Sequence, residues 1–332
     1  MVARVAAIDI GTVSSRLALA VVRDGAVTSH KKRTVITDLG EGVDATSRLS
    51  DAAIERVLAA CREFAAEASA FAPDGTCTTL TSAARDAENG GVLLAGLADL
   101  GLCPIVIPGE VEARLTFFGV AHDFPGQRIA VADSGGGSTE IACGRLDPAP
   151  ETGEPGCLRL DAVESLDIGC RRVTDRFLLP SPPDAQRLDR ASSFAAEAFG
   201  RYWGRVGCAH PAPDRLIAVG GTVTTLVAMR ERMAVYDSAR VHLASLTQGD
   251  VEAMIALMEG CTADQIAELP GVQPKRAPVI LAGAVVIREL LRAGGYEELT
   301  VSENGLLTGM AVTMTETLER GATSIGWVPE LS

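Results

Sequence analysis

Two short segments of the chain carry residues that suit the binding of phosphate groups. The first, residues 9–15, reads DIGTVSS and contains Asp9, Gly11, Thr12 and Ser14. The second, residues 133–139, reads DSGGGST and contains Asp133, Ser134, Gly135, Gly136, Gly137, Ser138 and Thr139. Glycine has no Cβ, so the backbone N–H groups of such a loop can converge on an anion, while the hydroxyl groups add donors. Each aspartate ends an apolar run and is a candidate oxygen ligand for a divalent cation.

Either segment alone also has a structural explanation, because glycine and serine are ordinary residues of tight turns and an aspartate can cap its own turn. The repetition favours function: Asp133 follows Asp9 by 124 residues, and both belong to the pattern strand, acid, glycine loop, strand. Neither loop matches GxxxxGK(S/T), and neither opens a helix as a Rossmann loop does. The chain therefore contains an internal duplication, and we expect two related α/β domains that each carry one phosphate loop.

The elements expected around these loops alternate between strands and helices. In the first half they are antiparallel strands within 2–39, a helix from Ser50 to Pro73, a strand at 76–80, a polar loop at 81–89, a helix in the nineties, a strand at 103–109 and a helix from about Glu110. In the second half they are a strand, glycine loop and strand over 128–146, a hairpin loop at 148–156, a strand at 158–166, a long helix after Pro183, a strand, double glycine and helix over 214–232, a helical pair over 247–293, and a strand, turn and helix over 298–318. The domain boundary is expected near residues 122–127.

Composition excludes several classes of protein. The net charge of −13 argues against a general nucleic-acid binder and against binding to an anionic membrane surface, so an anionic substrate needs a local cationic site or a metal. Asp9 interrupts the N-terminal apolar stretch, and the longest apolar run, at 277–287, is too short to span a membrane. The eight cysteines form no CxxC pair. We expect a cytoplasmic protein with buried thiols.

Eight motifs in one order give the chain a family resemblance. They are AIDIGTVSSRL, TSAARDAEN, PGEVEARLTFFGV, DSGGGSTE, SLDIGCRRVTDRF, AVGGTVTTLVAM, VQPKRAPVILAGA and VSENGLLTGM. Together they resemble the Ppx/GppA phosphatases, which are the exopolyphosphatases and guanosine pentaphosphate phosphohydrolases. The resemblance covers roughly residues 4–315, nearly the whole chain.

The resemblance implies a fold and a domain plan. The fold is α/β: the actin-like, duplicated ribonuclease H-like fold of the sugar kinase and heat-shock ATPase superfamily, with the active site in the interdomain cleft. We expect domain I over 1–124, with the first phosphate loop and the catalytic glutamate. Domain II is expected over 125–332, with the second loop and a C-terminal helix that packs back on domain I. The resemblance is to the short form, so no HD-like C-terminal domain is expected, and a homodimer is a possible assembly because family members are often dimers.

The resemblance also implies catalytic residues. The family places its general base at the second of two paired glutamates, which is the position of Glu112, whereas Glu110 is displaced by one residue from that pair. On a helix these two side chains point about 200° apart, so one of them faces the substrate. Without the resemblance, Glu112 is explained as an ordinary solvated carboxylate. Arg85 and Arg16 match family arginines that clamp phosphate charge, and each is otherwise explained as a surface ion pair.

Further site residues follow from the same comparison of motifs. Glu140 matches the glutamate of GGGSTE as a second acidic group near metal or water. Mg²⁺ or another divalent metal is expected at Asp133, the better candidate, and at Asp9. The double glycine loop, with Gly220, Gly221 and Thr222, matches the third loop of the superfamily, which in this branch closes the site or contacts a guanosine base; its alternative is a helix-opening turn. Arg171 and Arg172 lie outside any glycine loop and are not counted as catalytic.

The leading functional hypothesis is an exopolyphosphatase that releases orthophosphate from inorganic polyphosphate, with water activated by Glu112. The same residues permit hydrolysis of guanosine pentaphosphate or a nucleoside triphosphate, and the departures from family motifs at Val13, Pro108 and Ser134 leave this choice open. A non-catalytic alarmone-binding sensor and a sugar or acid kinase are the alternatives of other classes. The motif GEVEARL favours the phosphatase branch over the kinases, and the retained Glu112 and Arg85 favour an enzyme over a sensor.

Overall fold

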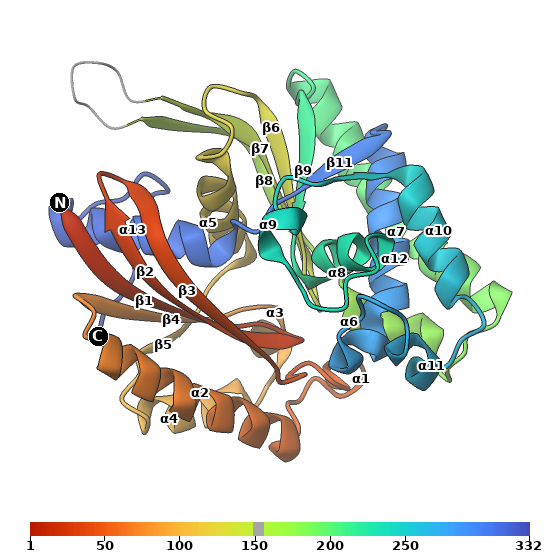
Figure 1. The fold of residues 1–332 in the computed structure, drawn as a ribbon, viewed down its shortest axis with the longest axis horizontal. Helices are drawn as coiled ribbons and strands as arrows, with labels where there is room; N and C mark the ends of the chain where they lie inside the picture. Colours follow the sequence, from red (N-terminus) through yellow and green to blue (C-terminus); the bar gives the residue numbers. More distant parts are fainter. Residues whose placement is uncertain (149–155) are drawn as a thin grey trace. The chain divides into compact units, whose positions relative to one another are not determined.

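The computed structural model describes residues 1–148 and 156–332 (Figure 1). The expected hairpin loop at 148–156 therefore lies mostly outside the described residues. The chain divides into two compact units. Unit 1 contains Met1–Gln127, Gly144–Val163 and Asn304–Ser332, and unit 2 contains Arg128–Cys143 and Glu164–Glu303. In the part of the chain that is described, no helix has the length and apolar character needed to cross a membrane.

Unit 1 is built on a five-stranded sheet in the order β3-β2-β1-β4-β5. Its strands are β1 (Val2–Ile10), β2 (Ser14–Arg23), β3 (Ala26–Ile36), β4 (Gly75–Leu80) and β5 (Pro104–Val106). β1 pairs antiparallel with β2 and parallel with β4, and β4 pairs parallel with β5. The strands predicted from the apolar pattern of the first half are therefore confirmed, and Asp9 comes at the end of the central strand.

Helices cover the two faces of this sheet (Figure 1). They are α1 (Val43–Thr46), α2 (Asp51–Phe71), α3 (Ser82–Asp86), α4 (Gly90–Ala98), α5 (Gly109–Ala121) and α13 (Leu306–Arg320). The Ser50 hydroxyl accepts a hydrogen bond from the Ala53 N–H, which confirms the predicted start of α2. Apolar residues of α2 and α4 form a core with alternate residues of β1, among them Ile8 and Ile10. The polar loop expected at 81–89 is wrong in part, because α3 lies within it.

Unit 2 contains most of a six-stranded sheet in the order β10-β11-β9-β6-β7-β8. Its strands are β6 (Ile129–Ser134), β7 (Thr139–Asp147), β8 (Cys157–Leu166), β9 (Arg215–Val219), β10 (Ser245–Thr247) and β11 (Glu298–Val301). The outer parts of β7 and β8, within Gly144–Val163, belong to unit 1. Read from β8, the order β8-β7-β6-β9-β11 repeats the order of unit 1, with β10 added antiparallel at the edge. The repeated topology confirms the duplication and the actin-like fold.

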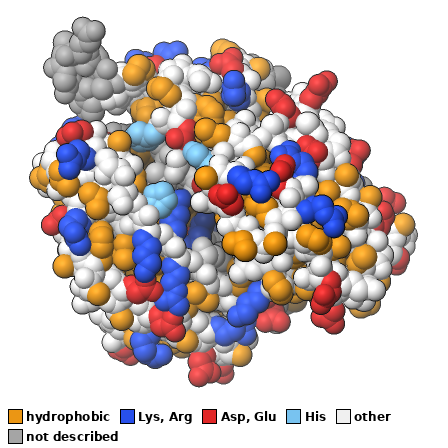
Figure 2. Space-filling model, in the orientation of Figure 1, with side chains coloured by type: hydrophobic (Ala, Val, Ile, Leu, Met, Phe, Trp, Pro, Cys, Tyr) orange, Lys and Arg blue, Asp and Glu red, His pale blue; other side chains and the backbone are white. Residues whose placement is uncertain are grey.

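The helices of unit 2 follow the predicted order with short additions. They are α6 (Cys170–Val173), the π-helical turn η1 (Thr174–Leu178), α7 (Ala185–Ala209), α8 (Gly221–Arg230), α9 (Ser238–Val241), α10 (Gln248–Met258), α11 (Ala263–Ala267), the 3₁₀ turn η2 (Pro274–Arg276) and α12 (Ala277–Gly294). The helical pair expected over 247–293 corresponds to α10 and α12, with α11 between them. Figure 2 shows basic side chains interspersed with acidic and apolar ones on the face in view.

In unit 1, α13 crosses α5 at very close range. A Cβ added at Gly309 would lie 1.8 Å from the Leu115 carbonyl oxygen, and one added at Gly119 would lie 2.3 Å from the Gly305 carbonyl oxygen. Real Cβ atoms do not approach backbone atoms so closely, so the two backbones touch only because these positions are glycine. The crossing fixes α5, the helix that carries Glu112.

Candidate active site

The first glycine loop is closed by one backbone hydrogen bond. Gly11 N–H donates to the carbonyl oxygen of Ser14 at 3.0 Å, which forms the turn between β1 and β2. The Thr12 side chain is buried and packs over Gly40, where an added Cβ would lie 2.2 Å from Thr12 Cγ2. Gly11 and Ser14 therefore close the turn, and Thr12, one of its two central residues, is held against the body of unit 1.

Asp9 and Arg16 form an ion pair at the base of this loop. They are directly opposed on β1 and β2, and Arg16 donates from Nε at 2.9 Å and from Nη2 at 2.6 Å to Asp9 Oδ2. Asp9 is fully buried, and its Oδ1 atom has no hydrogen-bond partner among the described residues. One oxygen of Asp9 is thus neutralised by arginine, and the other remains a candidate ligand.

Glu112 and Arg85 form a second ion pair in unit 1. Arg85 Nη1 donates to Glu112 Oε2 at 2.8 Å and to the Ile107 carbonyl oxygen at 2.9 Å. Glu112 is buried, whereas Glu110 is exposed. An arginine at this distance favours the charged form of a carboxylate, which is the form a general base needs.

Thr81 connects this ion pair to the first loop. Its N–H donates to the Ile10 carbonyl oxygen at 3.2 Å, and its own carbonyl accepts from Arg85 N–H at 3.1 Å. A Cβ added at Gly11 would lie 4.0 Å from Thr81 Oγ1. The structure thus brings the first loop, the Asp9 pair and the Glu112 pair together at one end of the unit 1 sheet.

The second glycine loop, in unit 2, closes in the same way as the first. Gly135 N–H donates to the Ser138 carbonyl oxygen at 3.0 Å, the same distance as in the corresponding bond from Gly11 to Ser14. Both residues of this bond lie 124 positions after their counterparts in the first loop. The two loops therefore share a backbone conformation as well as a sequence pattern.

The third loop lies directly against the second. Gly220 has a φ of +105°, and a Cβ there would lie 2.8 Å from the Ser134 carbonyl oxygen and 3.2 Å from Asp133 Oδ1. Only glycine fits this position, so the close approach of Asp133, Ser134 and Gly220 is built into the sequence. The Thr222 side chain is buried and faces Gly283 of α12, where an added Cβ would lie 2.5 Å from its Oγ1.

Glu140 and Thr139 continue the second loop into β7. Glu140 is buried, and its Oε1 atom accepts a hydrogen bond from Ser165 Oγ of β8 at 2.7 Å. Thr139 Oγ1 donates to the Ile168 carbonyl oxygen at 2.6 Å, so its hydroxyl hydrogen is used within unit 2. Ser134 is also buried, and no partner for its Oγ atom is found in the described chain.

The sequence predicts a divalent metal at Asp133 and Asp9, and the oxygen atoms of the two loops can be compared with that prediction. Among residues 1–148 and 156–332, no three His, Cys, Asp or Glu side chains form a group that could hold a metal ion. The free oxygen of Asp9 and the buried hydroxyl of Ser134 are hard oxygen donors, which suit Mg²⁺. Mg²⁺ commonly uses one or two carboxylates with water and substrate phosphates, so each of these donors, taken within its own unit, is of a chemical type that Mg²⁺ accepts.

Three functional candidates were missed in the sequence. Arg172 donates to the second loop at Gly137, Ser165 donates to Glu140, and the Arg276 guanidinium lies over Gly221, where an added Cβ would be 1.9 Å from Nη1. Arg172 and Arg276 stand in motifs that support the resemblance, SLDIGCRRVTDRF and VQPKRAPVILAGA. The presence of these two arginines in the family motifs could have marked them as candidates, but the motifs do not show which loop each arginine contacts.

Comparison with known proteins decides the family. A sequence model of the Ppx/GppA phosphatase family matches residues 19–318. The chain belongs to the Ppx/GppA phosphatase family. Exopolyphosphatase 2 of Mycobacterium tuberculosis is 34% identical over 338 residues, a match that covers 94% of this chain and 98% of the relative. The Ppx/GppA resemblance inferred from the eight motifs is thereby confirmed.

Solved structures of Ppx/GppA proteins share the fold. The Aquifex aeolicus family member is 29% identical and superposes with a TM-score of 0.76, covering 97% of this chain and 100% of that one. A crystal structure described as an exopolyphosphatase-like protein is 31% identical with a TM-score of 0.82, covering 94% and 97% of the two chains. The Ppx/GppA fold is therefore preserved along nearly the whole chain.

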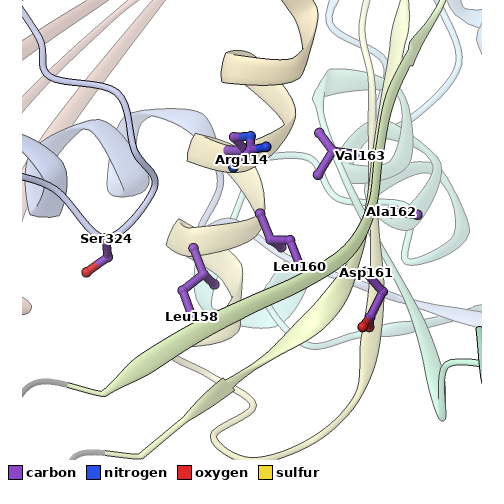
Figure 3. Close-up of a pocket in the computed structure, with 7 residues that line it drawn as sticks. All are labelled: Arg114, Leu158, Leu160, Asp161, Ala162, Val163 and Ser324. Atoms are coloured by element: carbon purple, nitrogen blue, oxygen red, sulfur yellow. The ribbon is translucent and has the colours of Figure 1, made fainter.

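A separate pocket of about 320 Å³ in unit 1 contains none of the predicted site residues (Figure 3). It is lined by β8 residues, by Ser324 and by Arg114. Arg114 is two residues after Glu112 on α5, so it lies on the opposite side of that helix. The pocket therefore does not contain the Glu112 pair.

Proposed function

We propose that this protein is an exopolyphosphatase: it hydrolyses the terminal phosphoanhydride of inorganic polyphosphate and releases orthophosphate. The observation that carries the proposal is the buried Glu112 carboxylate, held by Arg85 at 2.8 Å and connected through Thr81 to the first glycine loop. The whole-length similarity to a relative named exopolyphosphatase 2 supports the choice of substrate.

The proposed reaction assigns a role to each group. Glu112 takes a proton from water, and the water oxygen forms a bond to the terminal phosphorus. The bond from that phosphorus to the bridging oxygen breaks, and the shortened chain leaves with the electron pair. Arg85 orients Glu112, and the glycine loops at 9–14 and 133–139 bind phosphate oxygens. Arg16, Glu140 and the third loop at 220–222 complete the proposed set.

Asp133 and Asp9 would hold a divalent metal, Mg²⁺ in the first instance. Such an ion neutralises phosphate charge, which a protein of net charge −13 otherwise repels. Asp133 of the second glycine motif is taken as the main ligand, and Asp9, whose Oδ2 atom is bonded to Arg16, as the second one. The homodimer stays a prediction.

Orthophosphate release from long-chain polyphosphate with Mg²⁺, measured beside guanosine pentaphosphate and ATP, tests the proposal. Wild-type protein is expected to act on polyphosphate, and Glu112→Gln to lose at least about 10²-fold in rate. Glu110→Gln is the matched control, because it makes the same change two residues away at an exposed position.

The three substrates separate the outcomes. If the protein prefers guanosine pentaphosphate or ATP, the proposed substrate is wrong, but the assignment as a hydrolase stands. If folded wild-type protein releases no phosphate from any of them, the hydrolase proposal is wrong. Titration of guanosine tetraphosphate would then test the sensor hypothesis.

A further inference from the structure

The second glycine loop is held from behind by the start of α6. Cys170 N–H donates to the Gly135 carbonyl oxygen at 3.0 Å, and Arg171 N–H donates to the Gly136 carbonyl oxygen at 2.8 Å. The contact is tight, since a Cβ added at Gly169 would lie 2.3 Å from the carbonyl carbon and oxygen of Gly136. Two successive loop carbonyls are thus bound by backbone amides of one short helix.

The third carbonyl is bound by a side chain. Arg172 Nε donates to the Gly137 carbonyl oxygen at 2.7 Å, and this bond spans 35 residues of sequence. The arginine is buried, and Asp167 lies 3.8 Å from its Nη2 atom but is 83% exposed, so solvent weakens that ion pair. A buried guanidinium therefore lies directly behind the loop.

These three bonds orient the other side of the loop. In a planar trans peptide the C=O and N–H groups point in opposite directions. Because the carbonyls of 135, 136 and 137 point toward α6, the N–H groups of Gly136, Gly137 and Ser138 point away from it. Successive N–H groups on one side of a loop form a concave anion-binding nest.

We propose that Arg172 is a positioning residue for phosphate binding: its guanidinium fixes the Gly137–Ser138 peptide so that the Ser138 N–H faces the bound phosphate. The inference rests on the proposed function. It gives a role to a residue for which the family resemblance implied none. Arginine suits this role because its planar Nε–H is a directed donor, whereas lysine provides only a mobile point charge.

The test compares Arg172→Ala with Arg288→Ala. Arg288 is a control from the same unit, because its guanidinium bonds to Glu289 and Ser192 and not to a glycine loop. For Arg172→Ala, kcat/KM on polyphosphate and the affinity for inorganic phosphate are expected to fall about tenfold to one hundredfold. Millimolar guanidinium is expected to restore part of the activity of Arg172→Ala and none in the control.

A direct structural readout is hydrogen exchange of the peptide that contains residues 134–139. Exchange there is expected to be faster in Arg172→Ala and unchanged in Arg288→Ala. If Arg172→Ala does not fold, Arg172→Lys and Arg172→Gln replace it, and both are expected to bind phosphate more weakly than wild type.

The results distinguish the inference from the proposed function. If wild type is active and the Arg172 variants match the control in kinetics, phosphate affinity and exchange, the inference is wrong and the function stands. If wild type releases no phosphate, the proposed function fails. The affinity for inorganic phosphate and the hydrogen exchange of residues 134–139 then still test the inference. If both are unchanged in the Arg172 variants, the inference is wrong.

Discussion

Arg85 Nη1 lies 2.8 Å from Glu112 Oε2 and joins α3 to α5. The two helices are separated by α4 and β5 in the chain, and in the proposed reaction the paired side chains act as one unit. The consequence is that substitutions of the two residues should not have independent effects on the reaction.

A double-mutant cycle measures this coupling. Glu112→Gln is expected to lower kcat by about 10² to 10⁴, and Arg85→Met by about 10-fold or more, because the base loses its orientation. The double variant should be no worse than Glu112→Gln by more than about threefold, since residues that act as a unit are not additive. Multiplicative losses in phosphate release would contradict the pairing.

The Asp9–Arg16 pair predicts an effect on stability. Arg16→Met leaves a fully buried carboxylate without its arginine, which should lower the free energy of unfolding by about 3 kcal/mol, the low end for a buried pair because Arg16 is 27% exposed. Asp9→Asn combined with Arg16→Met should recover part of this loss. Urea denaturation of wild type and both variants measures these free energies, and a stability of Arg16→Met equal to that of wild type would show that the pair contributes nothing.

The glycine crossing of α5 and α13 predicts a second stability effect, coupled to activity. Gly309→Ala places a methyl group 1.8 Å from the Leu115 carbonyl oxygen, so the helices must separate. The expected cost is at least about 2 kcal/mol of unfolding free energy. The rate of phosphate release should also fall by more than the loss of folded protein explains, because α5 carries Glu112.

Gly200→Ala is the matched control for this change. Gly200 lies within α7 with open space around its Cβ position, so alanine should raise the unfolding free energy by about 0.5–1 kcal/mol. If both substitutions have the same effect in thermal and urea denaturation, the close helix crossing is not a requirement of the fold.

The sequence allowed the strands and loops to be predicted because their signals are local. The acid, glycines and hydroxyls of each loop directly follow an apolar run. Ser50 is the N-cap residue of α2 and so predicts where that helix begins. The repeat of Asp9 at Asp133 predicted the duplication that the two strand orders confirm. Short-range spacing was sufficient for the loops and for α2, and the recurrence of one local pattern was sufficient for the duplication.

The remaining parts of the site depend on contacts between residues far apart in the chain. Arg172 reaches Gly137 across 35 residues and Ser165 reaches Glu140 across 25, and neither pair leaves a periodic or spacing signal. The short helix α3 was expected as a loop, because its five residues are too few to show helical periodicity. Its position follows from the bond between Thr81 N–H and the Ile10 carbonyl.

The cysteines predict a pattern of chemical reactivity. Burial raises the pKa of both Cys61 and Cys77 to about 12, so almost no thiolate forms near neutral pH. Cys103 and Cys157 are exposed. Alkylation of the native protein followed by peptide mass spectrometry should modify Cys103 and Cys157 first, with Cys61 and Cys77 modified only after unfolding. Early modification of the buried pair would contradict their placement in the core.

Asp9 and Asp133, each the last residue but one of its strand, predict different dependence of the activity on Mg²⁺. The proposal takes Asp133 of the second glycine motif as the main metal ligand and Asp9, whose Oδ2 atom is bonded to Arg16, as the second one. Asp133→Asn should therefore raise the Mg²⁺ concentration for half-maximal phosphate release by about tenfold or more, the scale of a lost charged contact. Asp9→Asn should raise it less, and chelation of the metal should stop the wild-type reaction. A larger shift for Asp9→Asn would reverse the assignment and make the buried Asp9 carboxylate, through its Oδ1 atom, the main metal ligand.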